Sequence, residues 1–227
     1  MLFLFNSISL FSQENNYRYV FHEDYAQAVI SIKRIRPTLK KECDYFKVDP
    51  KLAEAIVFPE LIRISILKEK IESAGLALFY VNYGKAYSNF SAGIFQMKPS
   101  FIEELEKFAE ENKRLIGSSH IFAYAANLDD KAMRKSRVVR IFSIEWQCRY
   151  VALFIKVLKQ KFPIAEMIIS ERVLFCSSAY NYGFNKQYNE INRAKTLHLF
   201  PYGIFSPFKQ YSYADISLWY YNQEENE

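Results

Sequence analysis

Glu60 stands in the setting of this chain that best suits proton transfer. It follows Pro59 directly, and apolar residues flank the pair: Ala-Ile-Val-Phe precede the proline, and Leu61 and Ile62 follow the glutamate. If these neighbours are buried, the charged form of the carboxyl is disfavoured and its pKa rises. A carboxyl that stays protonated near neutral pH can donate a proton to a leaving oxygen. The alternative is a surface glutamate at a helix kink, paired with Arg63.

A second stretch, residues 90–101, reads Phe-Ser-Ala-Gly-Ile-Phe-Gln-Met-Lys-Pro-Ser-Phe and predicts a shaped loop before a helix. Gly93 lets the backbone approach a ligand or a neighbouring segment closely. Gln96 carries an amide that both donates and accepts hydrogen bonds. After the proline, Ser100 and Glu103 fit a capping box that starts a helix. Alone, this stretch is consistent with a sugar-binding loop or with an ordinary loop-to-helix connection.

Together with a third stretch, these residues resemble the signatures of one enzyme family. Residues 93–99, Gly-Ile-Phe-Gln-Met-Lys-Pro, are similar to the Gly-Leu-Met-Gln-x-x-Pro signature of lytic transglycosylases and goose-type lysozymes. Residues 179–183, Ala-Tyr-Asn-Tyr-Gly, are similar to their Ala-Tyr-Asn-Ala-Gly signature. Glu60 stands upstream, where that family keeps its catalytic acid. The resemblance covers residues 49–183.

The resemblance implies a set of site residues. Glu60 becomes the catalytic acid. Five further residues are expected to bind the substrate: Ser91, Phe95, Gln96, Tyr180 and Asn181. In the family, a serine before the central loop hydrogen-bonds the acid, and Ser88 and Ser91 are both candidates for that role here.

Two departures from the family pattern concern the supporting residues. The family's serine directly after the acid is Leu61 in this chain. The stretch between Glu60 and Gln96 is also longer than in the family, and an insertion at residues 76–87 accounts for it. We expect that insertion to form an extra wall of the substrate groove.

The spacing of apolar residues predicts a mostly helical chain. Asp49 and Pro50 form a helix start, as N-cap and first helical residue, and Pro59 is expected to interrupt that helix. Pro37 should end or kink an earlier one. Further helices are predicted at residues 24–35, 38–46, 101–115, 164–179 and 186–199, with one or two each at 61–82 and 130–162. The predicted fold class is mainly α, and the resemblance implies a lysozyme-like helical domain with at most a small β-hairpin near the active-site loop, at residues 83–95.

The chain is expected to hold one principal domain. Its 227 residues are half hydrophobic, enough for a full core, and its six glycines and seven prolines argue against a turn-dense β protein. Residues 1–13 are predicted to be a signal peptide, too short to span a membrane; the alternative is an apolar helix packed on the core. A helical lead-in follows at 14–48, then the lysozyme-like catalytic domain at 49–200. An aromatic C-terminal tail, 201–227, is expected to pack on that domain.

The charge of the chain suits an anionic polymer as partner. The formal net charge is +5 and the pI is about 8.9. Nucleic acid is not expected, because no dense Lys/Arg cluster is present. Peptidoglycan strands carry carboxylates and would be attracted to a mildly basic surface. The net charge is equally consistent with a basic surface that binds no partner. No cofactor or metal is signalled: Cys43, Cys148 and Cys176 lack zinc-site spacing and read as buried thiols. The oligomeric state is left open.

The chemistry implied by the resemblance needs one glutamate. Glu60 would protonate the β-1,4 bond between N-acetylmuramic acid and N-acetylglucosamine, then act as a base while the muramyl 6-hydroxyl attacks its own anomeric carbon, leaving a 1,6-anhydro end. The predicted function is an exported lytic transglycosylase of the periplasm or cell envelope. One alternative is a hydrolytic muramidase, in which Glu171 or Asp215 could supply a second carboxylate. The other is a non-catalytic peptidoglycan-binding protein, favoured by the two departures.

Overall fold

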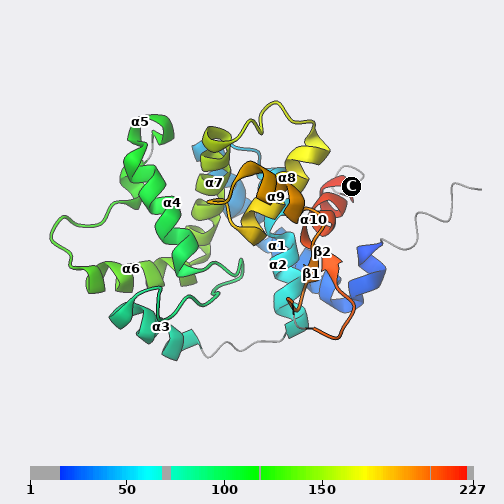
Figure 1. Cartoon of the computed structure of the whole chain (residues 1–227), viewed down its shortest axis with the longest axis horizontal. Coiled ribbons are helices and arrows are strands. Elements are labelled where there is room, and N and C mark those ends of the chain that lie inside the picture. Colours follow the sequence, from blue (N-terminus) through cyan, green and yellow to red (C-terminus); the bar gives the residue numbers. More distant parts are fainter. Residues whose placement is uncertain (1–15, 68–72, 118, 205, 224–227) are drawn as a thin grey trace, which may run out of the picture.

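Helix α2 (Pro50–Leu67), drawn in cyan in Figure 1, is the helix against which four others pack. Its residues from Leu52 to Ile62 are buried on every side of the helix, the pattern of a helix enclosed by others. It contacts α1 (Tyr17–Phe46), α7 (Ile144–Lys161), α8 (Ile169–Tyr182) and α10 (Tyr213–Gln223). This computed structural model describes residues 16–67, 73–117, 119–204 and 206–223, so the predicted signal peptide lies outside the described residues.

The prolines of the first two helices do not break them. Helix α2 begins at Pro50 as predicted, where the Asp49 side chain accepts a hydrogen bond of 2.9 Å from the Lys51 amide. The prediction that Pro59 interrupts α2 is wrong, because the helix continues to Leu67. The hydroxyl of Tyr213 donates to the carbonyl of Ile56 at 2.8 Å, in the turn that the proline disturbs. The burial of the residues on both sides of Pro59 thus outweighs the cost of about 3 kcal/mol that a proline inside a helix imposes.

Helix α1 likewise replaces two predicted helices. It runs through Pro37 without ending, although His22 near its start has a non-helical backbone (φ 43°). Its buried residues include Ile32, Leu39 and Cys43, and the helix contacts α2 and α7. The packing of these buried residues against α2 and α7 keeps α1 continuous through Pro37.

The remaining helices follow the predicted order with shifted boundaries. They are α3 (Ser73–Tyr83), α4 (Pro99–Glu111), α5 (Lys113–Ile116), a 3-10 turn (Ser119–Phe122), α6 (Asp130–Phe142) and α9 (Tyr188–Ala194). The predicted stretch 130–162 is two helices, α6 and α7, separated at Ser143, whose hydroxyl caps α7. Helix α8 begins at Ile169, later than the predicted residue 164. Among the helices that the structure describes, none is long and apolar enough to cross a membrane.

The prediction of a mainly α-helical fold with a small hairpin is confirmed, although the hairpin lies elsewhere. Strands β1 (His198–Phe200) and β2 (Tyr211–Ser212) pair antiparallel, next to α10. The expected position near residues 83–95 holds only an isolated antiparallel bridge between Ala92 and Met97. Within the predicted aromatic tail, α10 packs against α2 and α8 and buries Tyr213 and Tyr220.

A buried charge network ties α3, α4, α6 and α7 together. Glu106 of α4 is 8% exposed and accepts hydrogen bonds from Tyr124, Tyr150, Arg137 and Arg140. Arg137 and Arg140 of α6 therefore point inward, towards Glu106. A buried carboxylate with this many donors is satisfied, and its role is structural.

Candidate active site

Glu60 lies on α2 with only 3% of its surface exposed. Its carboxylate oxygens accept hydrogen bonds from Nη1 of Arg63, one turn along the helix, at 2.8 and 2.7 Å. Burial raises the pKa of Glu60 above its ordinary value, while the charge and hydrogen bonds of Arg63 oppose this shift. The buried glutamate and the Arg63 partner, predicted as alternatives, therefore occur together.

The Arg63 pair by itself is not a mark of catalysis. Glu42 and Glu54 are also buried and also pair with arginines, each through two hydrogen bonds of 2.8–3.0 Å. Arg63 differs from those arginines in reaching towards α8, because its Nη2 lies 3.5 Å from Oδ1 of Asn181. Glu60 also lines a pocket that Glu42 and Glu54 do not line.

The central loop is held in place by a buried amide. Ala92 and Met97 exchange backbone hydrogen bonds of 2.9 and 3.0 Å across a tight turn. Inside it, the amide of Phe95 donates to the side chain of Gln147 at 2.9 Å. Gly93 has φ +70°, and a Cβ there would lie 2.1 Å from the Gln147 amide nitrogen. Glycine is therefore required both by the backbone conformation and by the space that Gln147 fills.

Gln96 completes the turn. Its backbone has φ 48°, unusual for a residue with a side chain. Its Nε2 donates to the carbonyl of Gly93 at 2.9 Å, which stabilises the turn while the residue lines the pocket. The predicted capping box at Ser100 is wrong, because α4 begins at Pro99 and the Ser100 amide donates to the side chain of Asn89 at 3.0 Å.

Tyr180 and Asn181 lie in the last turn of α8, which ends where Gly183 adopts φ +127°. The Tyr180 hydroxyl donates to the carbonyl of Phe95 at 2.7 Å and so joins α8 to the central loop. Burial and the nearby charge of Glu60 raise the pKa of Tyr180 well above its ordinary value. The hydroxyl therefore remains a protonated donor across the physiological range.

These segments surround a cavity of about 300 Å³. Five of the predicted site residues line it: Glu60, Ser91, Gln96, Tyr180 and Asn181. Phe95 does not line this cavity, because its side chain is fully buried in the core and it meets the site only through its backbone. Of the two candidate serines, Ser91 lines the cavity, whereas Ser88 is buried and donates to the carbonyl of Leu76.

Sequence reasoning missed two contributors. Tyr213, placed by the sequence in the aromatic tail, lies beside Glu60 while its hydroxyl donates to the carbonyl of Ile56, and nothing in the local pattern around it indicates this position. Glu104 of α4, which no motif singled out, lines the cavity and accepts a hydrogen bond of 3.2 Å from Asn185. The residues named for a second carboxylate, Glu171 and Asp215, do not line this cavity.

No protein-family model, no curated protein and no solved structure matches this chain. The resemblance to lytic transglycosylases and goose-type lysozymes therefore remains a prediction that rests on the motifs. Among the residues that the structure describes, no group of three or more His, Cys, Asp or Glu side chains gathers in a way that could hold a metal ion.

The fit between Gly93 and Gln147 can be tested by Gly93→Ala. The added Cβ meets Gln147 and must adopt a strained φ, so the free energy of unfolding should fall by roughly 2–4 kcal/mol. Gly84→Ala is the matched control, since Gly84 has φ +82° but open space around it, and should cost only about 1–2 kcal/mol. Denaturant unfolding measures both. Equal losses would mean that Gln147 does not constrain the loop.

Proposed function

We propose that this chain is an exported peptidoglycan lytic transglycosylase that cleaves the β-1,4 bond between N-acetylmuramic acid and N-acetylglucosamine. One observation carries the proposal: a shielded carboxyl, the loop amide and the end of α8 surround one cavity, although they come from segments far apart in sequence. Glu60, Gln96 and Tyr180 represent these segments. They are the residues that the three motifs single out.

In this reaction Glu60 acts first as an acid and then as a base. It donates a proton to the glycosidic oxygen as the bond from that oxygen to the muramyl anomeric carbon breaks. The resulting carboxylate accepts the proton of the muramyl 6-hydroxyl, whose oxygen bonds to the same carbon. Because the nucleophile belongs to the substrate, one protein carboxylate suffices. Gln96 and Asn181 supply amides to the sugars.

Arg63 affects the two halves of this cycle in opposite ways. Its hydrogen bonds at 2.7–2.8 Å favour the carboxylate form of Glu60, which the second half requires. They disfavour the protonated form, which the first half requires. A substrate that further excludes water from the cavity raises the pKa of Glu60 and so favours the acid.

Two other functions each have a specific observation in their favour. Glu104 places a second carboxylate on the cavity, as hydrolysis by a muramidase would need. The ion pair of Glu60 with Arg63 resembles the structural pairs of Glu42 and Glu54, which favours a non-catalytic peptidoglycan-binding protein.

The products of wall digestion distinguish these functions. Purified sacculi are incubated with the wild-type protein, Glu60→Gln and Glu104→Gln, and the released muropeptides are analysed by mass spectrometry. We expect 1,6-anhydro muropeptides, one water lighter than reducing products, from the wild type and from Glu104→Gln, and at least a hundredfold less product from Glu60→Gln.

Other results would overturn the proposal. Reducing-end products that disappear in Glu104→Gln indicate a hydrolase with two carboxylates. Binding of sacculi without products from any of the three proteins indicates the non-catalytic alternative. Undiminished lysis by Glu60→Gln removes Glu60 from the reaction.

The electrostatic effect of Arg63 predicts a shift in the pH profile. Arg63→Gln keeps a hydrogen-bond donor but removes the charge that lowers the pKa of Glu60. The pKa should then rise, and activity that needs the protonated acid should persist to higher pH. The alkaline limb of lysis, followed by the turbidity of sacculi, should move upward relative to the wild type. An unchanged or downward-shifted limb would contradict the acid role.

A further inference from the structure

Helix α3 and the turn after it expose three aromatic side chains in succession. Phe79, Tyr83 and Tyr87, which we call the aromatic strip, are 56%, 60% and 75% exposed. Their ring centroids follow one another at 6.2 and 5.5 Å, so the rings form one continuous surface. Leu76 and Leu78 on the same helix are also exposed, at 43% and 63%. Contiguous exposed apolar groups of this kind usually mark a binding surface.

The strip is carried by a firmly anchored element. Tyr80, between its members, is fully buried and donates its hydroxyl to Glu103 of α4 at 2.7 Å. Arg137 of α6 donates to the same hydroxyl at 2.6 Å. Arg134 of α6 donates to the carbonyl of Val81 at 2.9 Å. Helix α3 is thus held by α4 and α6, and its exposed rings need little ordering to bind a ligand.

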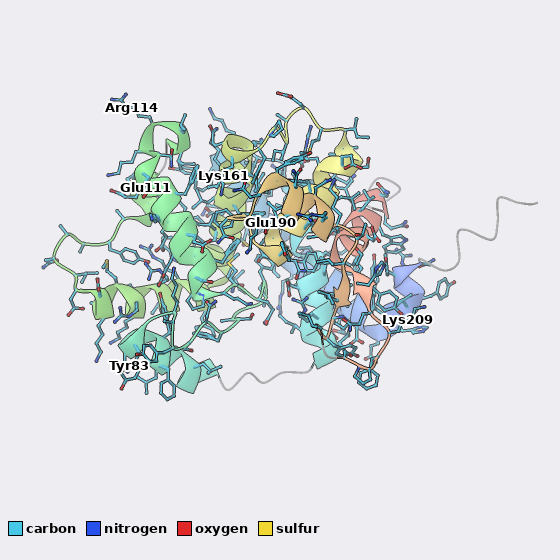
Figure 2. The ribbon with its side chains drawn as sticks, viewed as in Figure 1. Tyr83, Glu111, Arg114, Lys161, Glu190 and Lys209 are labelled. Carbon is cyan, nitrogen blue, oxygen red and sulfur yellow. The ribbon has the colours of Figure 1, made fainter. Side chains whose placement is uncertain are left out.

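An open hollow continues from the strip towards the candidate active site. Tyr83 lines this hollow, which measures about 500 Å³ and lies between the end of α3, α4 and α6. Figure 2 shows Tyr83 on α3, close to α4 and α6. Glu104 of α4 lines both this hollow and the cavity that contains Glu60. The hollow, which Tyr83 lines, and the cavity that contains Glu60 are therefore neighbours on either side of Glu104.

We propose that the aromatic strip and the hollow bind sugar rings of the same peptidoglycan strand, away from the bond that Glu60 cleaves. This inference rests on the proposed function for the identity of the polymer. Flat aromatic side chains stack on the apolar faces of sugar rings, and tyrosine hydroxyls can bond the sugar hydroxyls at their edges. A long, regular polymer that reaches from the strip to the neighbouring cavity makes two contacts at once, which strengthens binding without new chemistry.

The charges of the hollow fit peptidoglycan better than an anionic lipid surface. Its lining holds four cations and three carboxylates: Lys85, Lys107, Arg134 and Arg137 with Glu103, Glu104 and Asp130. Peptide stems carry both amino and carboxyl groups and can pair with both signs. An anionic membrane would instead select a cluster of basic residues.

The test measures binding without cleavage, in Glu60→Gln protein, by co-sedimentation with purified sacculi. We expect Tyr83→Ala/Tyr87→Ala to weaken binding by about tenfold, the loss expected for two stacked rings. The matched control is Tyr19→Ala/Tyr45→Ala on α1, whose tyrosines are 69% and 50% exposed, and its binding should be unchanged. Thermal unfolding of both double variants verifies that the fold is retained.

The other outcomes separate this inference from the proposed function. Equal binding by both double variants, or no binding by the Glu60→Gln parent, overturns the strip as a glycan site. Weaker binding confined to Tyr83→Ala/Tyr87→Ala supports the strip even if the wild type releases no anhydro products, in which case only the transglycosylase proposal fails. If Tyr83→Ala/Tyr87→Ala binds sacculi normally but no longer binds anionic phospholipid vesicles, the strip is a membrane-binding surface. If it binds sacculi normally but no longer self-associates in sedimentation, the strip contacts a second copy of the chain. Either result overturns the inference.

Discussion

The burial of one carboxyl group on the central helix is the constraint on which the candidate site depends. Helix α2 is enclosed along most of its length, so a glutamate there loses its hydration and needs partners from the protein. Arg63 provides them from the next turn, and Tyr213, from the far end of the chain, lies beside the carboxyl group. Glu60 also lines a cavity, which residues of the central loop and α8 line as well.

The partners of Glu60 decide what the site can do. Elsewhere in the molecule, buried glutamates such as Glu106 are fully paired and connect helices. Glu60 combines an arginine partner with contact to a cavity, so a ligand can change its surroundings. Desolvation favours the neutral acid and Arg63 favours the anion. A reaction that uses both forms in turn needs these two effects to be close in strength.

The sequence predicted the features of the site that depend on local chemistry. Asp49 and Pro50 begin α2 as expected, and the backbone at Gly93 comes close to a neighbouring segment, the side chain of Gln147, as expected. Three motifs predicted a common pocket, and Glu60 and Gln96 do line one cavity.

Features that depend on distant segments were not predictable from local patterns. Pro37 and Pro59 remain inside helices because packing against other helices outweighs the local cost. The side chain of Asn89 accepts the hydrogen bond of the Ser100 amide in the first turn of α4, because the preceding loop folds back on the helix start. Phe95 points into the core because Gln147, far along the chain, fixes its backbone.

The titration of the Glu60 carboxyl in the free protein is the most direct test of its assignment as proton donor. Carbon-13 NMR of glutamate labelled at the side-chain carboxyl follows this group, and comparison with Glu60→Gln assigns its resonance. The midpoint should lie above the value of about 4.3 for an unperturbed glutamate, because burial outweighs Arg63. A midpoint at or below that value would show that the ion pair dominates and that Glu60 is held as a structural carboxylate.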